Sequence, residues 1–94
     1  MDFDNSVDYV SKLMKVTDSD VELSSEEKLK IYSLYKQSVI GDCNTEKPSF
    51  FHFVKSAKWN SWNELKGTSH EDAKNKYIAF VNELKIKYDQ SNFA

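Results

Sequence analysis

The sequence predicts an all-α protein, a four-helix bundle with a long loop between the second and third helices. Apolar residues recur with helical spacing in several segments, which is typical of amphipathic helices packed around one core. Only two glycines and one proline are present, too few for the many tight turns of a β-sandwich. With 94 residues the chain has room for one modest core, so we expect a single domain, residues 1–94.

The first helix is expected from Phe3 to about Val16, followed by an acidic connector over residues 17–23. Its apolar positions are spaced as i, i+4, i+7 and i+10 or i+11, which places them on one stripe. These positions are Phe3, Val7, Val10 and either Leu13 or Met14.

The second helix is expected from Ser25 to Ile40, because Ser24 and Glu27 have the spacing of a capping box. Gly41 can adopt the left-handed conformation that ends a helix. The loop that follows is rich in turn-forming residues, and it is long enough to cross the bundle and let two neighbouring helices run parallel.

A short third helix is expected from about Lys55 to Lys66, with Gly67 as its terminating glycine. Three phenylalanines precede it, and we expect them to anchor the loop: Phe50, Phe51 and Phe53. The fourth helix begins with a second capping pattern, either Thr68 with Glu71 or Ser69 with Asp72. Its apolar stripe consists of Ala73, Tyr77, Phe80 or Val81, Leu84 and Tyr88.

Several functional classes are disfavoured by the residues themselves. The sequence has no Gly-rich phosphate loop, no Cys/His cluster with metal spacing and no HExxH or GxSxG motif, so we expect no enzyme, catalytic residue, metal or cofactor. The net charge is −2 and arginine is absent, which argues against a nucleic-acid partner. A single cysteine, no apolar leader and no run near the roughly 18 residues of a membrane span predict a cytoplasmic protein without stable membrane insertion.

The second helix offers a candidate ligand face. Tyr32, Tyr35 and Lys36 share one side of it, and two phenols with an ammonium suit a flat heterocycle that carries phosphate. Lys58 and Tyr77 could join them from the third and fourth helices. The alternative is that tyrosines at helical spacing simply belong to the core.

Four segments of the chain resemble the acyl-CoA-binding protein family. They are residues 31–38 (IYSLYKQS), the loop residues Gly41-Asp42 and Asn44–Pro48, residues 57–69 (AKWNSWNELKGTS) and the tail from Glu71 to Tyr88. The resemblance covers about Phe3 to Tyr88. It implies an up-down-down-up bundle whose crossover loop is Gly41–Pro48. It also implies a monomeric carrier of long-chain fatty acyl-CoA esters that transports and buffers them without catalysis and passes them to acyl-CoA-using enzymes.

The resemblance also implies roles for individual residues. The tyrosine that matches Tyr35 stacks on the adenine, and the positions of Tyr32, Lys36 and Lys58 serve the ribose and its 3′-phosphate. Tyr77 would lie beside the head group, and Leu29 and Ala57 would belong to the groove for the acyl chain. The implied acyl-CoA site therefore comprises Tyr32, Ser33, Leu34, Tyr35, Lys36, Lys58 and Tyr77, with Leu29, Ser11, Val54 and Ala57 as secondary members.

The chain departs from the family pattern at two lysine positions and in one connector. Ser11 and Val54 occupy positions where members usually have lysines, which makes the phosphate site less basic. Residues 17–23 form a longer connector than in typical members. These departures keep one alternative open, a protein-interaction module that retains the fold and binds acyl-CoA weakly or not at all.

Overall fold

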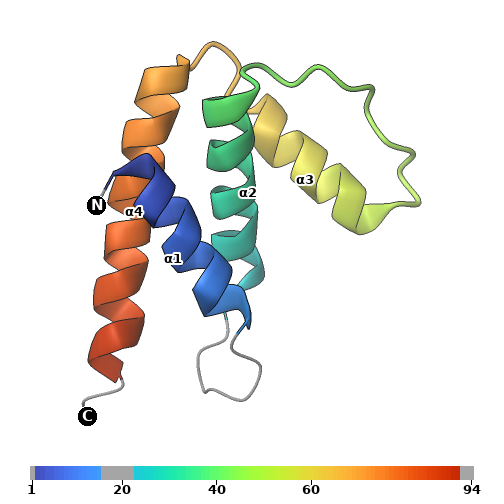
Figure 1. The fold of residues 1–94 in the computed structure, drawn as a ribbon. Coiled ribbons are helices and arrows are strands. Elements are labelled where there is room, and N and C mark those ends of the chain that lie inside the picture. Colours follow the sequence, from blue (N-terminus) through green and yellow to red (C-terminus); the bar gives the residue numbers. More distant parts are fainter. Residues whose placement is uncertain (1, 16–22, 92–94) are drawn as a thin grey trace.

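The structure, a computed structural model, describes residues 2–15 and 23–91, and within them it contains four helices and no strand (Figure 1). They are α1 (Phe3–Lys15), α2 (Ser25–Val39), α3 (Phe53–Asn63) and α4 (His70–Ser91). Helix α2 packs against both α4 and α3, and α1 packs against α4. The predicted all-α bundle is confirmed.

The order of the helices in space is up-down-down-up, as expected. In Figure 1, α1 and α4 run in one direction and α2 and α3 run in the other. The loop between α2 and α3 makes this possible because it carries the chain away from the end of α2 and returns it to start α3 in the same direction.

The helix ends follow the predicted capping chemistry in most places. The Glu27 N–H donates to Ser24 Oγ at 3.1 Å, and the Ser24 N–H donates to Glu27 Oε1 at 2.8 Å, which completes the capping box of α2. Gly41 has φ 100° and Gly67 has φ 92°, the left-handed conformation expected of both. At the start of α4, Ser69 Oγ accepts a 3.0 Å bond from the Asp72 N–H, which decides between the two predicted caps.

Helix α3 differs from the prediction at both ends. It begins at Phe53 instead of Lys55 and ends at Asn63 instead of Lys66. Beyond Asn63 the N–H groups of Leu65 and Lys66 bond to carbonyls three residues back, at 3.0 and 3.1 Å. Turns of this tighter type end the α-helical pattern before Gly67 is reached.

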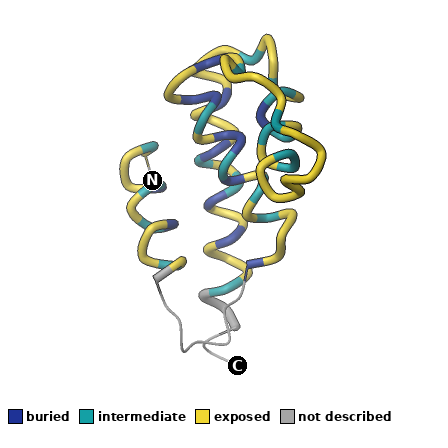
Figure 2. The backbone as a smooth tube through the Cα atoms, turned by 90° about the vertical axis from the view of Figure 1, so that its right-hand side faces the viewer, coloured by how far each residue is buried: buried dark blue, intermediate teal, exposed yellow. Residues whose placement is uncertain are grey.

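The core lies where α1, α2 and α4 meet. Figure 2 shows buried positions spaced between exposed ones along the helices, as one-sided packing requires. Leu13 packs against this core whereas Met14 is 47% exposed, and Val81 is fully buried whereas Phe80 is only partly buried. The buried core consists of Val10, Leu23, Ile31, Leu34, Tyr77, Val81 and Leu84.

Leu23 was assigned to the connector by its sequence, yet it is a core residue with 7% exposure. The rest of the predicted connector, residues 17–22, lies outside the described residues, as do Val16 and the tail residues 92–94.

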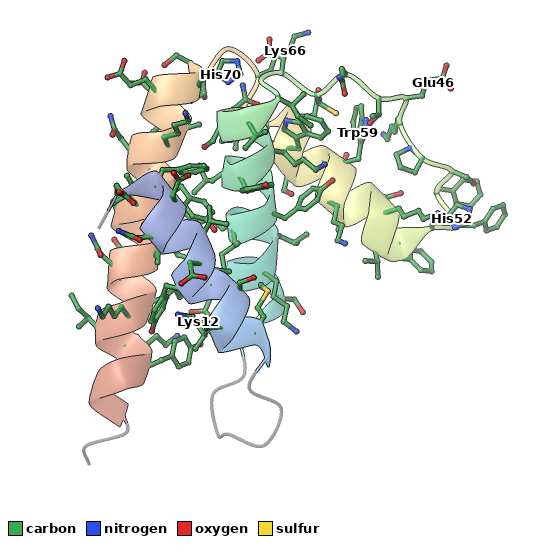
Figure 3. All side chains as sticks on the ribbon, viewed as in Figure 1. Lys12, Glu46, His52, Trp59, Lys66 and His70 are labelled. Atoms are coloured by element: carbon green, nitrogen blue, oxygen red, sulfur yellow. The ribbon has the colours of Figure 1, made fainter. Side chains whose placement is uncertain are left out.

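The prediction that three phenylalanines anchor the long loop is wrong. Phe50, Phe51 and Phe53 expose 72–80% of their surface. Two tryptophans hold the loop instead: Trp59 Nε1 donates to the Thr45 carbonyl at 2.9 Å, and Trp62 Nε1 donates to the Gly41 carbonyl at 2.8 Å. Figure 3 shows Trp59 directed from α3 toward the loop.

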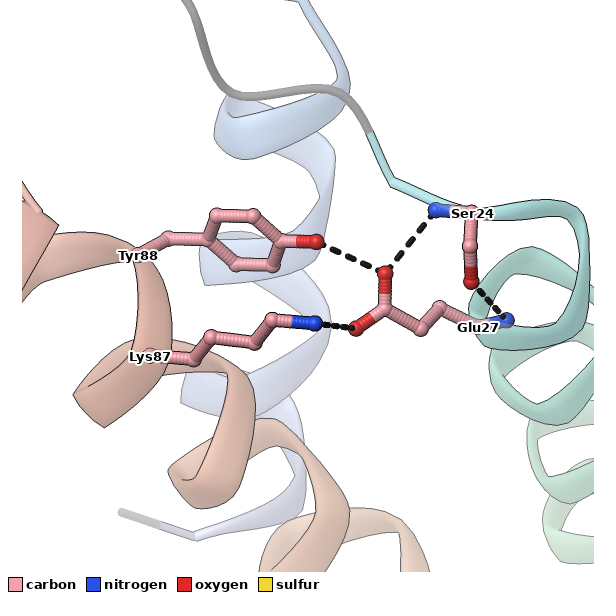
Figure 4. Close-up of polar contacts among 4 residues, drawn as sticks. All are labelled: Ser24, Glu27, Lys87 and Tyr88. Carbon is pink, nitrogen blue, oxygen red and sulfur yellow. Dashed lines mark hydrogen bonds and ion pairs between the residues drawn. The ribbon is translucent and has the colours of Figure 1, made fainter.

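Glu27 links the start of α2 to the end of α4 (Figure 4). Its carboxylate accepts a 2.7 Å hydrogen bond from Tyr88 Oη and lies 3.1 Å from Lys87 Nζ, in addition to the capping bond from the Ser24 N–H. Partial burial raises the pKa of the Glu27 carboxyl, but these donors together outweigh burial and lower the pKa to about 2. The carboxylate form is therefore stabilised in the folded protein.

We expect the Glu27→Gln variant to be less stable than the wild type by about 2 kcal/mol at neutral pH, because it loses the charge that the folded protein stabilises. This figure allows for the solvent that screens part of the contact with the exposed Lys87. Glutamine retains the capping acceptor but loses the charge. Because the folded pKa is depressed to about 2, the Glu27 contribution is present above the unfolded pKa near 4.5 and is lost as the pH falls from 4.5 to 2. Urea unfolding at several pH values measures this difference.

Glu26→Gln is the matched control, because Glu26 is an exposed residue in the same helical turn. It should leave stability nearly unchanged at every pH. A stability difference between wild type and Glu27→Gln that stays constant between pH 7 and pH 2 would contradict this assignment of the Glu27 carboxylate.

Candidate functional site

Two lysines from different helices converge on one tyrosine. Lys36 Nζ lies 5.8 Å and Lys58 Nζ lies 5.3 Å from the centre of the Tyr32 ring. Lys36 is one turn after Tyr32 on α2, and Lys58 comes from the middle of α3, so the packing of α3 on α2 creates the group. We name Lys36 and Lys58 the lysine pair.

The two lysines at the Tyr32 ring have no neutralising carboxylate in the described part of the chain. Within residues 2–15 and 23–91, neither lysine forms a salt bridge. The Tyr32 ring attracts both ammonium groups through its negative face. Two positive charges around one tyrosine ring favour an anion, such as a phosphate, that can contact both.

Lys36 also contacts the ring of the buried Trp62. Lys36 Nζ lies 5.6 Å from the centre of the Trp62 ring, and Trp62 is 3% exposed and fixed by its bond to the Gly41 carbonyl. The ammonium group of the half-buried Lys36 therefore lies near a fixed aromatic ring, which restricts where it can lie. The sequence placed Trp62 on α3 but did not indicate this supporting role.

Three aromatic rings form a second group beside the first. Phe3 stacks on Tyr35 with ring centres 6.2 Å apart and an interplanar angle of 11°, and Phe3 lies 5.2 Å from Tyr77. Tyr35 and Tyr77 are 6.4 Å apart. Lys74 Nζ lies 5.4 Å from the Phe3 ring centre. We name Phe3, Tyr35 and Tyr77 the aromatic triad.

The members of the aromatic triad differ in exposure. Tyr35 is 38% exposed, whereas Tyr77 is 1% exposed. Burial, together with the neighbouring Tyr35, raises the pKa of the Tyr77 phenol to about 12, so Tyr77 is a neutral hydroxyl at physiological pH. The triad therefore offers one accessible ring, Tyr35, on a rigid aromatic support.

The C-terminal end of α2 is fixed to the turn between α3 and α4. The Gln37 amide donates to Asp42 Oδ1 at 2.9 Å and to the Thr68 carbonyl at 2.8 Å, and the Gly67 N–H donates to the same Asp42 oxygen at 2.9 Å. The bond from Gly67 and then the bond from Gln37 lower the pKa of the Asp42 carboxyl. This network sets the relative position of the helices that contribute Lys36 and Lys58.

Two predicted site residues, Ser33 and Leu34, are buried, and their contacts with the ligand stay predictions. Leu34 lies within the core, and Ser33 has its hydroxyl bonded to the Lys30 carbonyl at 3.2 Å. Leu34 shares this core with Tyr77 of the aromatic triad. Both residues line a cavity of about 300 Å³ between α2 and α4, whose other residues are Lys30, Leu65, Lys76, Ala79, Phe80 and Glu83.

The secondary predicted residues are spread over three helices. Leu29 on α2 and Ala57 on α3 are half-buried, whereas Ser11 on α1 is exposed and Val54 is 69% exposed. Their predicted contacts with the ligand stay predictions. Phe3, Lys74 and Trp62 were not among the predicted site residues, although the apolar stripe of the first helix and the family resemblance both indicated that Phe3 packs against the last helix.

The described part of the chain has neither a cluster of metal ligands nor a membrane-spanning helix. No group of three or more His, Cys, Asp or Glu side chains there could hold a metal ion. Among the helices described, none has the length and apolar character to cross a bilayer.

Comparison with known proteins shows similarity to acyl-CoA-binding proteins. The model of the family "Acyl CoA binding protein" matches residues 1–81. Acyl-CoA-binding protein homolog 3 of Caenorhabditis elegans is 43% identical over 82 residues, 87% of this chain and 69% of the relative. The acyl-CoA-binding protein of Saccharomyces cerevisiae is 41% identical over 80 residues, 85% of this chain and 92% of the relative.

The fold agrees with these relatives. The crystal structure of Oryza sativa acyl-CoA-binding protein 2 superposes with a TM-score of 0.82 at 31% identity, and the match covers 95% of this chain and 92% of that one. The crystal structure of the acyl-CoA-binding protein from Moniliophthora perniciosa also gives a TM-score of 0.82, at 33% identity over 90% of this chain and 78% of that one. This chain therefore belongs to the acyl-CoA-binding protein family.

Proposed function

We propose that this protein binds long-chain fatty acyl-CoA esters and serves as their intracellular carrier and buffer pool without transforming them. The observation that supports the proposal most is the lysine pair at the Tyr32 ring. One member of the pair, Lys36, directly follows Tyr35, whose ring is accessible. A CoA head group has the matching parts, a flat adenine and a phosphorylated ribose. The family relationship supports an acyl-CoA ester as the ligand.

In this proposal the head group lies along α2. Tyr35 stacks on the adenine from its exposed side, because Phe3 occupies the other side of the ring. Lys36 and Lys58 bind the 3′-phosphate, and Tyr32 and Tyr77 lie beside the ribose. Hydrogen bonds to a charged group contribute about 1.5–3 kcal/mol each, so two lysines can provide much of the head-group affinity.

The acyl chain would follow an apolar path that includes Leu29 and Ala57. Each methylene removed from water contributes about 0.8 kcal/mol, so a long chain can exceed the head group in its contribution. Ser11 and Val54 supply no charge to the pyrophosphate. We therefore expect affinity to depend strongly on the length of the chain.

The proposal extends to the setting of the protein. It is a cytoplasmic monomer with one acyl-CoA-binding domain, residues 1–94, acting in fatty-acid metabolism and needing no cofactor. Acyl-CoA-using enzymes are its expected donors and acceptors, and it has no nucleic-acid partner.

Calorimetric titration with acyl-CoA esters of increasing chain length tests the proposal. We expect saturable heat at one ligand per protein for a long-chain ester and an affinity that rises with each added methylene. Free CoA, which lacks the tail, should bind much more weakly. An absence of saturable heat with every ester would contradict the proposal and favour the interaction module.

A further inference from the structure

An exposed apolar surface stands at the start of α3. Phe50, Phe51, Phe53 and Val54 expose 69–80% of their surface, and we name these four residues the phenylalanine tip. Phe50 and Phe51 contact each other with ring centres 4.2 Å apart. Single exposed apolar residues are ordinary, but three neighbouring phenylalanines in a chain of this size indicate a contact surface.

The phenylalanine tip is an ordered feature. The Phe51 N–H lies 3.4 Å from Ser49 Oγ, and the His52 N–H donates to the Ser49 carbonyl at 2.9 Å. Ser56 Oγ also donates to this carbonyl, at 3.3 Å, which joins the turn to α3. The rings are therefore exposed by the local backbone structure.

The position of the tip favours contact with a broad surface. His52, which lies between Phe51 and Phe53 in the sequence, marks the end of α3 that projects away from α1 and α4 in Figure 3. Projecting rings can enter a soft, flat phase such as the headgroup layer of a bilayer.

The charges around the tip are complementary to anionic lipid. Residues 44–60 contain Lys47, Lys55 and Lys58 but one acid, Glu46, which gives a local net charge of +2 in a protein whose net charge is −2. Aromatic rings flanked by lysines are typical of peripheral membrane binding, because rings enter the interface while lysines meet anionic headgroups.

We propose that the phenylalanine tip docks reversibly on an anionic lipid bilayer. The rings of Phe50, Phe51 and Phe53 enter the headgroup layer, and Lys47 and Lys55 remain at its surface. Docking goes beyond ligand binding, and it needs no ligand. If the proposed carrier function also holds, docking would bring the α3 side of the site to the membrane.

Sedimentation with vesicles tests the proposal on ligand-free protein. Wild type should bind vesicles of phosphatidylcholine and phosphatidylserine, and binding should fall on vesicles of phosphatidylcholine alone and in high salt. The double variant Phe50→Ser, Phe51→Ser should lose about tenfold or more of the bound-to-free ratio, because it lacks two of the rings that enter the headgroup layer. Since no acyl-CoA is present, the result is independent of the proposed function.

Ile86→Ser is the matched control, because Ile86 is an apolar residue of α4 with 59% exposure. It should bind vesicles like the wild type, and the helical circular dichroism of all variants should be unchanged. Equal vesicle binding by wild type and the double variant would overturn the proposal. A wild-type dimer in sedimentation equilibrium that the double variant lacks would also overturn it, as the tip would then join two copies of this chain.

Discussion

Replacing Lys36 by alanine is expected to weaken the binding of a long-chain acyl-CoA by about tenfold or more. Lys36 supplies half of the lysine pair, and it is the member that rests on the buried Trp62 ring. Its loss leaves Lys58 alone with the phosphate. Because Lys36 forms no salt bridge among the described residues, helix content and stability should change little.

Lys30→Ala is the matched control for this experiment. Lys30 lies on the same helix, and its Nζ is 4.5 Å from the Phe80 ring centre. The Lys30→Ala variant therefore loses a comparable lysine–aromatic contact outside the lysine pair and the aromatic triad. Its acyl-CoA affinity should stay within about twofold of the wild type. Equal affinities for Lys36→Ala and Lys30→Ala in calorimetric titration would show that the α2 face has been assigned wrongly.

Replacing Trp62 by alanine is expected to lower the free energy of unfolding by about 3–5 kcal/mol. The side chain is 3% exposed, so alanine leaves a large cavity between α2 and α3. It also leaves the Gly41 carbonyl without the Nε1 donor at the end of α2. Urea unfolding measures the loss.

Trp62→Phe separates packing from hydrogen bonding, since phenylalanine fills most of the cavity and lacks the N–H group. We expect it to lose about 1–2 kcal/mol. Trp59→Ala is the position control, because Trp59 is only half-buried although its Nε1 also donates to the loop. If Trp59→Ala lowered the free energy of unfolding as much as Trp62→Ala, this would contradict the view that Trp62 makes the main stabilising contact between the loop and the helices.

The sequence was sufficient where the controlling interactions are local. The capping box at Ser24 and the glycine at residue 41 act within a few residues, so the bounds of α2 could be predicted closely. The register of Tyr32 and Lys36 is likewise a property of one helix. Their assignment to a CoA head group came from the family resemblance.

The features that were missed depend on contacts between distant segments. Hydrophobicity suggested that the three phenylalanines anchor the loop, but tryptophan bonds to Gly41 and Thr45 hold it and the phenylalanine rings are exposed. Phe3 joins Tyr35 only because α1 crosses α4 beside α2. Such pairings are set by tertiary packing, which a linear pattern does not encode.

The central claim is that the lysine pair binds the 3′-phosphate of an acyl-CoA, and one calorimetric comparison tests it most directly. The affinities of wild type and Lys36→Ala are measured for a long-chain acyl-CoA and for the same ester of dephospho-CoA, which lacks the 3′-phosphate. We predict that removing the phosphate weakens the wild type about tenfold or more and affects Lys36→Ala much less, because the two changes remove the same contact. Equal losses in both proteins, or no loss in the wild type, would contradict the claim.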